Sequence, residues 1–127
     1  MTEEFSKKGT EYEGMVFKIL KGDARFASVQ HWKDAYGKDV GIDFVGTRTS
    51  GGEYAIQVEY RDHDVTIDVN DIEGFVAKAS EVNMPMIFVY SGKSIGPAAK
   101  KLLDDHDCII WRHTFNYLAS LLNKLPD

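Results

Sequence analysis

The sequence predicts a single α/β domain, with a central mixed β-sheet flanked by helices in the order α-β-β-β-α-β-α-β-α. The 127 residues can bury one hydrophobic core, and no linker or internal repeat divides them, so we expect residues 1–127 to form one domain. Two strand-like segments in the first half are joined by a short glycine turn, which indicates an antiparallel pair. Two more apolar segments in the second half alternate with helical segments, which indicates parallel strands.

The first predicted elements are a helix and a strand. Apolar residues recur at helical spacing up to Leu20, so Gly9–Leu20 is expected to be a helix with one apolar face. Gly22 marks the predicted end of this helix. A short strand is expected at Phe26–Trp32, and the polar residues 33–40 are expected to form a loop.

The next two predicted strands form a β-hairpin. The segments Gly41–Thr47 (GIDFVGT) and Tyr54–Tyr60 (YAIQVEY) flank Ser50-Gly51-Gly52. Short glycine-rich turns join antiparallel strands, and the alternation of polar and apolar residues in YAIQVEY is typical of a strand. We therefore predict that these two strands are adjacent and antiparallel in one sheet.

The second half is expected to alternate helices with buried strands. Asn70 and Glu73 have the spacing of a capping box, which predicts a helix that ends at about Val82. Ser94 is the predicted N-cap of the next helix, which ends at Leu103. The remaining predicted elements are strands at Met86–Tyr90 and Cys108–Trp111 and an amphipathic helix at Phe115–Leu125.

The predicted core consists of apolar residues on the inward faces of these elements. Side chains two residues apart on a strand point to the same face, and an amphipathic helix buries its apolar side. Seven residues are expected to be buried: Ile56, Val58, Ile87, Val89, Ile109, Leu118 and Leu121.

The composition predicts a soluble, cytoplasmic protein. The first residues are polar and acidic, unlike a signal peptide, and no apolar run reaches the length of a membrane span. The single cysteine, Cys108, excludes an internal disulfide and is expected to be a buried thiol. The formal net charge of −5 argues against tight, unaided binding to nucleic acid, because contacts with phosphates require Lys and Arg.

Three polar residues of the hairpin are the candidate site. Asp43 belongs to the first strand, whereas Gln57 and Glu59 belong to the second and project from one face of it. Oxygen ligands from two neighbouring strands suit a hard divalent cation such as Mg²⁺. The hairpin therefore predicts a metal site formed by these three side chains.

These residues, taken in order, resemble the Mrr-like branch of the restriction-endonuclease-like nucleases, the PD-(D/E)xK superfamily. That branch has a helix glutamate, a G-[IV]-D motif and Q-x-K on the next strand, and this chain has Glu13, Gly41-Ile42-Asp43 and Gln57-x-Glu59. Lys8–Glu13 (KGTEYE) is also similar to the first motif of archaeal Holliday-junction resolvases. The resemblance covers nearly the whole chain and implies a restriction-endonuclease-like fold.

The resemblance implies hydrolysis of DNA phosphodiester bonds with Mg²⁺ or Mn²⁺ as cofactor. Asp43, Gln57 and Glu59 would then hold the metal, and Glu13 would add an outer carboxylate. DNA is the implied partner and a homodimer is allowed, whereas a membrane is not expected. The residues expected to contact the substrate are Arg61, Lys93 and Ser94, the last two at a helix N-terminus.

One departure from the family pattern leaves the activity open. The family's lysine is replaced by Glu59, which would either add a further carboxylate to an active site or mark a domain that has lost cleavage. Arg61, two residues later on the same face, offers a cation in its place. The alternatives to a metal-dependent endonuclease are a catalytically inactive module that binds DNA or protein, and a purely structural interaction domain. An ion pair between Glu59 and Arg61 would favour the inactive module.

Overall fold

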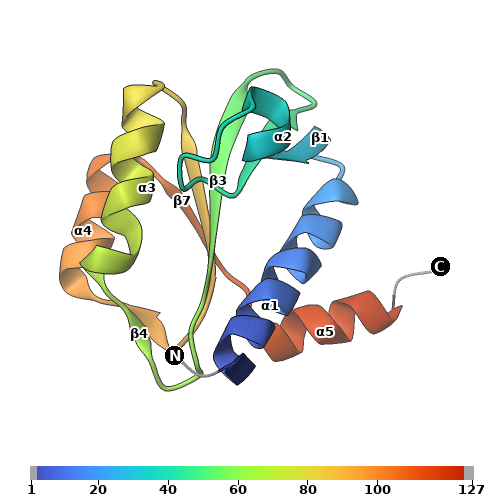
Figure 1. Cartoon of the computed structure of the whole chain (residues 1–127), viewed down its shortest axis with the longest axis vertical. Helices are drawn as coiled ribbons and strands as arrows, with labels where there is room; N and C mark the ends of the chain where they lie inside the picture. The colour runs from blue at the N-terminus through green and yellow to red at the C-terminus, as the bar shows by residue number, and fades with distance from the viewer. Residues whose placement is uncertain (1–2, 125–127) are drawn as a thin grey trace.

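The computed structural model describes residues 3–124 and the side chains of residues 7–122. It confirms a mixed α/β fold in which helices flank a five-stranded central sheet (Figure 1). Its elements are α1 (Glu3–Lys21), β1 (Phe26–His31), α2 (Trp32–Tyr36), β2 (Phe44–Arg48), β3 (Glu53–Tyr60), β4 (Thr66–Ile67), α3 (Val69–Glu81), β5 (Met86–Ser91), β6 (Ser94–Ile95), α4 (Pro97–Asp105), β7 (Ile109–Arg112) and α5 (Phe115–Lys124).

The central sheet has the strand order β1-β2-β3-β5-β7. Strands β1, β2 and β3 are antiparallel, whereas β3, β5 and β7 are parallel. The pairing of β2 with β3 runs from Phe44 opposite Ile56 to Thr47 opposite Glu53, which confirms the predicted hairpin. Strands β4 and β6 form a separate parallel pair.

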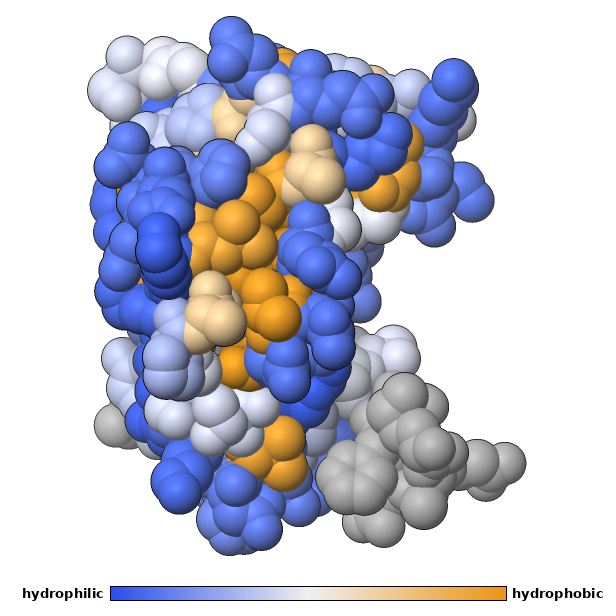
Figure 2. All heavy atoms as spheres, turned by 90° about the vertical axis from the view of Figure 1, so that its left-hand side faces the viewer, coloured by the Kyte–Doolittle hydropathy of each residue, from blue (hydrophilic) through white to orange (hydrophobic). Residues whose placement is uncertain are grey.

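Helices cover both faces of the sheet (Figure 1). One core lies between the sheet and helices α1 and α5 and includes Tyr12, Phe44 and Leu118. The other lies between the sheet and helices α3 and α4 and includes Phe75 and Leu103. Strand β5 is buried along its whole length because it lies inside the sheet and is covered on both faces. Figure 2 shows an apolar strip bordered by hydrophilic side chains on the side where α3 and α4 lie.

The core prediction is confirmed for four residues and wrong for three. Ile56, Ile87, Val89 and Leu118 are buried. The exceptions are only partly buried: Val58, where β3 extends beyond its pairing with β2, Ile109 on the edge strand β7, and Leu121 on α5. Burial is therefore deepest where a residue has an element on every side.

Three local predictions are wrong. Residues 33–40 do not form a loop throughout, because Trp32 is buried in the core and starts the one-turn helix α2, which ends at Gly37 in the left-handed conformation. Helix α3 starts one residue before Asn70, and its capping box is formed by Asp68 and Asp71. Ser94 caps no helix: it pairs with Thr66 in the small sheet, and Gly96 is the N-cap of α4. The predicted end of the last helix, Leu125, lies outside the described residues.

Truncation of Ile87 tests the assignment of β5 to the core. Ile87 is fully buried, and loss of a buried isoleucine side chain removes contacts and leaves a cavity. We expect Ile87→Ala to lower the free energy of unfolding by roughly 2–5 kcal/mol, as measured by urea denaturation. The same truncation of Val82, which is 46% exposed, is the control and should have little effect. Equal stability of the two variants would contradict the assignment.

Candidate metal centre and active site

Asp43 precedes β2, which begins at Phe44, so its predicted place on the first strand of the hairpin is wrong. It lies where strands β2 and β3 separate. Their pairing ends with Phe44 opposite Ile56, so the next part of β3 has no partner on this side. There the carboxylate of Asp43 accepts a hydrogen bond from the backbone N–H of Val58, with 2.8 Å between Oδ2 and N. The side chain of Asp43 therefore replaces the missing strand and is held in place by β3.

The turn before β2 positions this aspartate. Gly41 has a φ of +85°, a left-handed conformation that glycine adopts without strain. Asp39 stabilises the turn, because its Oδ1 accepts a hydrogen bond from the backbone N–H of Gly41 at 3.0 Å. Ile42 is buried in the core beside α3. The Gly-Ile-Asp motif thus combines a tight turn, a core anchor and a carboxylate that is held by β3.

Gln57 and Glu59 project from β3 on the same face as Ala55, opposite to the face of Ile56. The side-chain oxygen of Gln57, Oε1, is buried and has no hydrogen-bond partner among the described residues. A buried polar atom without a partner costs about 1–3 kcal/mol. This oxygen is therefore available to a ligand.

Asp43 lies in a negative environment. Burial is the main cause that raises the pKa of its carboxyl group from the ordinary value to about 7. The neighbouring carboxylates of Glu13 and Glu59 raise this pKa further, Glu13 also through a hydrogen bond, while the bond from Val58 N–H opposes them. Helix α1 thus brings the carboxylate of Glu13 close to that of Asp43.

Glu59 lies within an ion-pair bridge. Its Oε2 is 2.7 Å from Nη1 of Arg61, and Nη2 of the same guanidinium is 2.6 Å from Oδ1 of Asp71 on α3. Burial raises the pKa of Glu59, Arg61 lowers it, and Asp71 raises it. The guanidinium of Arg61 therefore lies between the carboxylates of Glu59 and Asp71. Asp71 was not predicted from the sequence, because its contact with Arg61 depends on the packing of α3 against β3.

A second group of possible metal ligands lies just beyond β3. Ligand atoms of Asp62, His63 and Asp64 are all within 4.8 Å of one another, and His63 and Asp64 are exposed. Among the described residues, the carboxylates of Glu13, Asp43 and Glu59 do not all lie this close to one another. The close convergence predicted for Asp43, Gln57 and Glu59 stays a prediction.

The other predicted substrate contacts lie at different places. Arg61 lines a pocket at the end of β3. Lys93 is exposed on the loop between β5 and β6, and the hydroxyl of Ser94 is 3.2 Å from that of Thr66. Because α4 begins at Pro97, neither Lys93 nor Ser94 lies at a helix N-terminus, and that part of the prediction is wrong.

The residues around Asp43 fit a divalent cation. Asp43 is a partly buried carboxylate among negative groups, and Gln57 offers an oxygen that lacks a partner among the described residues. Carboxylate and amide oxygens are the ligands that Mg²⁺ prefers, and a cation would offset the repulsion between Asp43, Glu13 and Glu59. A bound cation would thus satisfy both unfavourable features of this site.

The raised pKa of Asp43 predicts a pH dependence of stability. The folded protein holds the proton up to about pH 7, whereas an unfolded aspartate releases it near its ordinary value. Stability is therefore greatest at low pH as far as this group is concerned, and decreases as the pH rises to about 7. In EDTA, we expect the free energy of unfolding of Asp43→Asn relative to that of wild type to increase by roughly 3 kcal/mol from pH 5 to pH 8.

Urea denaturation at the two pH values measures this difference. Asp39→Asn, which changes an exposed aspartate four residues earlier, is the control and should follow the wild-type profile. Parallel profiles of wild type and Asp43→Asn would show that the carboxyl of Asp43 carries no such penalty.

Sequence comparison with known proteins gives two findings. A model of the protein family described as restriction endonuclease matches residues 21–121. No curated protein matches the chain significantly in sequence. Within residues 3–124, no helix combines the length and apolar character that a membrane span requires.

Several solved structures share the fold. The ATP-dependent Type ISP restriction-modification enzyme LlaBIII bound to DNA superposes with a TM-score of 0.69 at 17% identity, over 86% of this chain and 8% of that chain. The protein of unknown function AF1548 has a TM-score of 0.64 at 13% identity, over 91% of this chain and 67% of that chain. The DNA modification-dependent restriction endonuclease AspBHI has a TM-score of 0.52 at 12% identity, over 94% of this chain and 31% of that chain. The chain thus corresponds to a small part of the two restriction enzymes.

Proposed function

Because the chain belongs to the restriction endonuclease family, we propose that it is a metal-dependent, Mrr-like DNA endonuclease with Asp43, Gln57 and Glu59 in its active site. The observation that carries this proposal is the partly buried carboxyl of Asp43, whose pKa is raised to about 7 at the point where β2 and β3 separate. Carboxyl groups with strongly shifted pKa values are concentrated at functional sites.

The side chains have distinct roles in this proposal. Asp43 and Gln57 would hold the cation, and the N–H of Val58 orients Asp43. A bound divalent cation would lower the pKa of water and offset the charge on the phosphate oxygens. Glu13 adds an outer carboxylate.

Glu59 is the candidate general base. Arg61 binds its Oε2, which leaves Oε1 to accept a proton from the attacking water. Arg61 in turn keeps Glu59 oriented and balances the charges of Glu59 and Asp71. Glutamate at position 59 would then serve as the base, with Arg61 as the nearby cation.

Plasmid cleavage tests the proposal. We expect the purified chain to nick or linearise plasmid DNA with Mg²⁺ or Mn²⁺ and to be inactive in EDTA. The assay includes supercoiled plasmid, linear duplex and branched junctions, so that cleavage of any of these forms of DNA is detected. Inactivity on all of these substrates with either metal would overturn the proposal.

The second candidate is an inactive module that binds DNA or protein. The Glu59–Arg61 ion pair favours it, because this pair occupies one oxygen of a carboxylate that the metal would otherwise use. The net charge of −5 favours a protein partner over DNA. The measurement that discriminates between the two candidates is the rate of DNA cleavage by Glu59→Lys compared with wild type.

A further inference from the structure

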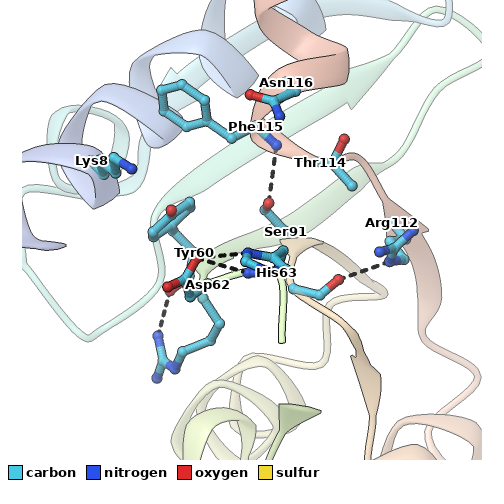
Figure 3. Close-up of a pocket in the computed structure, with 11 residues that line it drawn as sticks. Lys8, Tyr60, Asp62, His63, Ser91, Arg112, Thr114, Phe115 and Asn116 are labelled. Atoms are coloured by element: carbon cyan, nitrogen blue, oxygen red, sulfur yellow. Dashed lines mark hydrogen bonds and ion pairs between the residues drawn. The ribbon is translucent and has the colours of Figure 1, made fainter. Parts of the chain in front are cut away.

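A pocket with a volume of about 190 Å³ lies at the carboxyl ends of the parallel strands β3, β5 and β7 (Figure 3). In open α/β sheets, ligands bind outside the carboxyl ends of the strands. Its walls come from four parts of the chain: α1, the segment after β3, the end of β5, and the segment from β7 to the start of α5. The pocket is smaller than the roughly 300 Å³ or more of sites for drug-sized ligands, so it suits a small group.

Positive side chains surround this pocket. Lys8 on α1 and Arg112 at the end of β7 line it from opposite sides (Figure 3). Arg61 is a third cation in the lining. Nε of Arg112 donates to the carbonyl oxygen of Gly92 at 2.9 Å, which anchors the guanidinium at the rim. The N-terminus of α5 adds Thr114 and the partial positive charge of a helix start.

Asp62 is the acidic residue among those that line the pocket, and it already has partners. Its Oδ1 accepts the backbone N–H of His63 at 3.0 Å and lies 3.3 Å from Nδ1 of the same residue. Lys8 also acts on Asp62 electrostatically. Arg61 is already paired with Glu59 and Asp71, so Lys8 and Arg112 are the two lining cations that face the one carboxylate. The lining is therefore formally positive, although the chain as a whole is acidic.

We propose that this pocket binds a phosphate group of the DNA strand. Phosphate is small and anionic, and it is bound by Arg and Lys side chains and by helix N-termini. The pocket adjoins the candidate active site through Arg61, which lines the pocket and also pairs with Glu59. The proposal rests on the proposed function, and the phosphate it places here is a neighbour of the one that is cleaved.

The phosphate has two possible sources: a terminal 5′-phosphate or an internal phosphodiester. The experiment compares a short DNA duplex with 5′-phosphate ends and the same duplex with 5′-hydroxyl ends. Each carries a fluorophore at one 3′ end, and anisotropy is measured in EDTA at several salt concentrations, so that binding is observed without cleavage. The variants are Lys8→Gln and Arg112→Gln. Lys18→Gln, an exposed lysine on the same helix as Lys8, is the matched control.

We expect each pocket variant to bind more weakly and to lower the slope of log K against log salt by about 0.9, the value for one phosphate contact. Lys18→Gln should keep the wild-type slope. A loss confined to the 5′-phosphorylated duplex identifies a terminal phosphate, and an equal loss for both duplexes identifies an internal phosphodiester. Slopes in Lys8→Gln and Arg112→Gln equal to that of Lys18→Gln would overturn the proposal, as would absence of binding by the folded wild-type chain.

This outcome is separable from that of the proposed function. Asp43→Ala is measured in the same binding assay and in the cleavage assay. Binding that depends on Lys8 and Arg112 in a chain that never cleaves would support the pocket and refute the nuclease. Cleavage by a chain whose DNA binding does not change in Lys8→Gln and Arg112→Gln would support the nuclease and refute the pocket.

Discussion

Asp43→Ala is expected to lower metal-dependent DNA cleavage by at least about 10³-fold, because the cation's charge stabilisation of several kcal/mol is lost with its buried ligand. The measurement is the initial rate of plasmid cleavage with Mg²⁺ and Mn²⁺. Folding is checked by urea denaturation, where the variant should be at least as stable as wild type at pH 8, since it lacks the buried charge.

Asp64→Ala is the matched control for this prediction. Asp64 belongs to the exposed group with Asp62 and His63, which is the other set of possible metal ligands among the described residues. If the metal centre is at Asp43, Asp64→Ala should keep most of the wild-type rate. Loss of cleavage in Asp64→Ala with full activity in Asp43→Ala would move the metal centre to the Asp62–His63–Asp64 group.

Glu59→Lys is expected to lower cleavage by about 10²-fold or more, the contribution of a general base. The substitution restores the residue that the family has at this position, but in this chain it places a second cation beside Arg61. The new lysine removes the carboxylate that pairs with Arg61 and repels the metal. The expected result is therefore a loss of activity, even though the variant follows the family pattern.

The inactive-module hypothesis predicts the opposite result. If the wild type does not cleave and Glu59→Lys gains weak, Mg²⁺-dependent nicking, the chain is a descendant that lost its activity through this residue. Glu53→Lys makes the same change at an exposed position of the same strand and should leave the rate unaltered. Cleavage by Glu59→Lys at the wild-type rate would show that position 59 takes no part in the reaction.

The sequence by itself determined those parts of the structure that depend on neighbouring residues. The hairpin could be predicted because Gly51 and Gly52 both adopt positive φ in the turn, and because alternation defines a strand. Strand β5 could be predicted because a strand covered on both faces is a continuous apolar run. Asp43, Gln57 and Glu59 could be proposed together from the sequence because they lie in or next to one hairpin, where spacing determines which side chains share a face.

Features that depend on distant segments were decided only by the tertiary structure. Ser94 forms a strand because Thr66–Ile67 lies beside it, and no property of the sequence around Ser94 contains that pairing. Asp71 joins the Arg61 bridge because α3 packs against β3.

The charge of the pocket was likewise decided by the tertiary structure and not by the composition. Lys8 and Arg112 are far apart in the sequence, and α1 meets the end of β7 where the hydroxyl of Tyr12 donates to the carbonyl oxygen of His113 at 2.6 Å. A net charge of −5 sums over the whole chain, whereas a ligand responds to the few charges within a Debye length of about 8–10 Å. Composition therefore predicted an acidic protein, and only the fold brought three cations to one pocket.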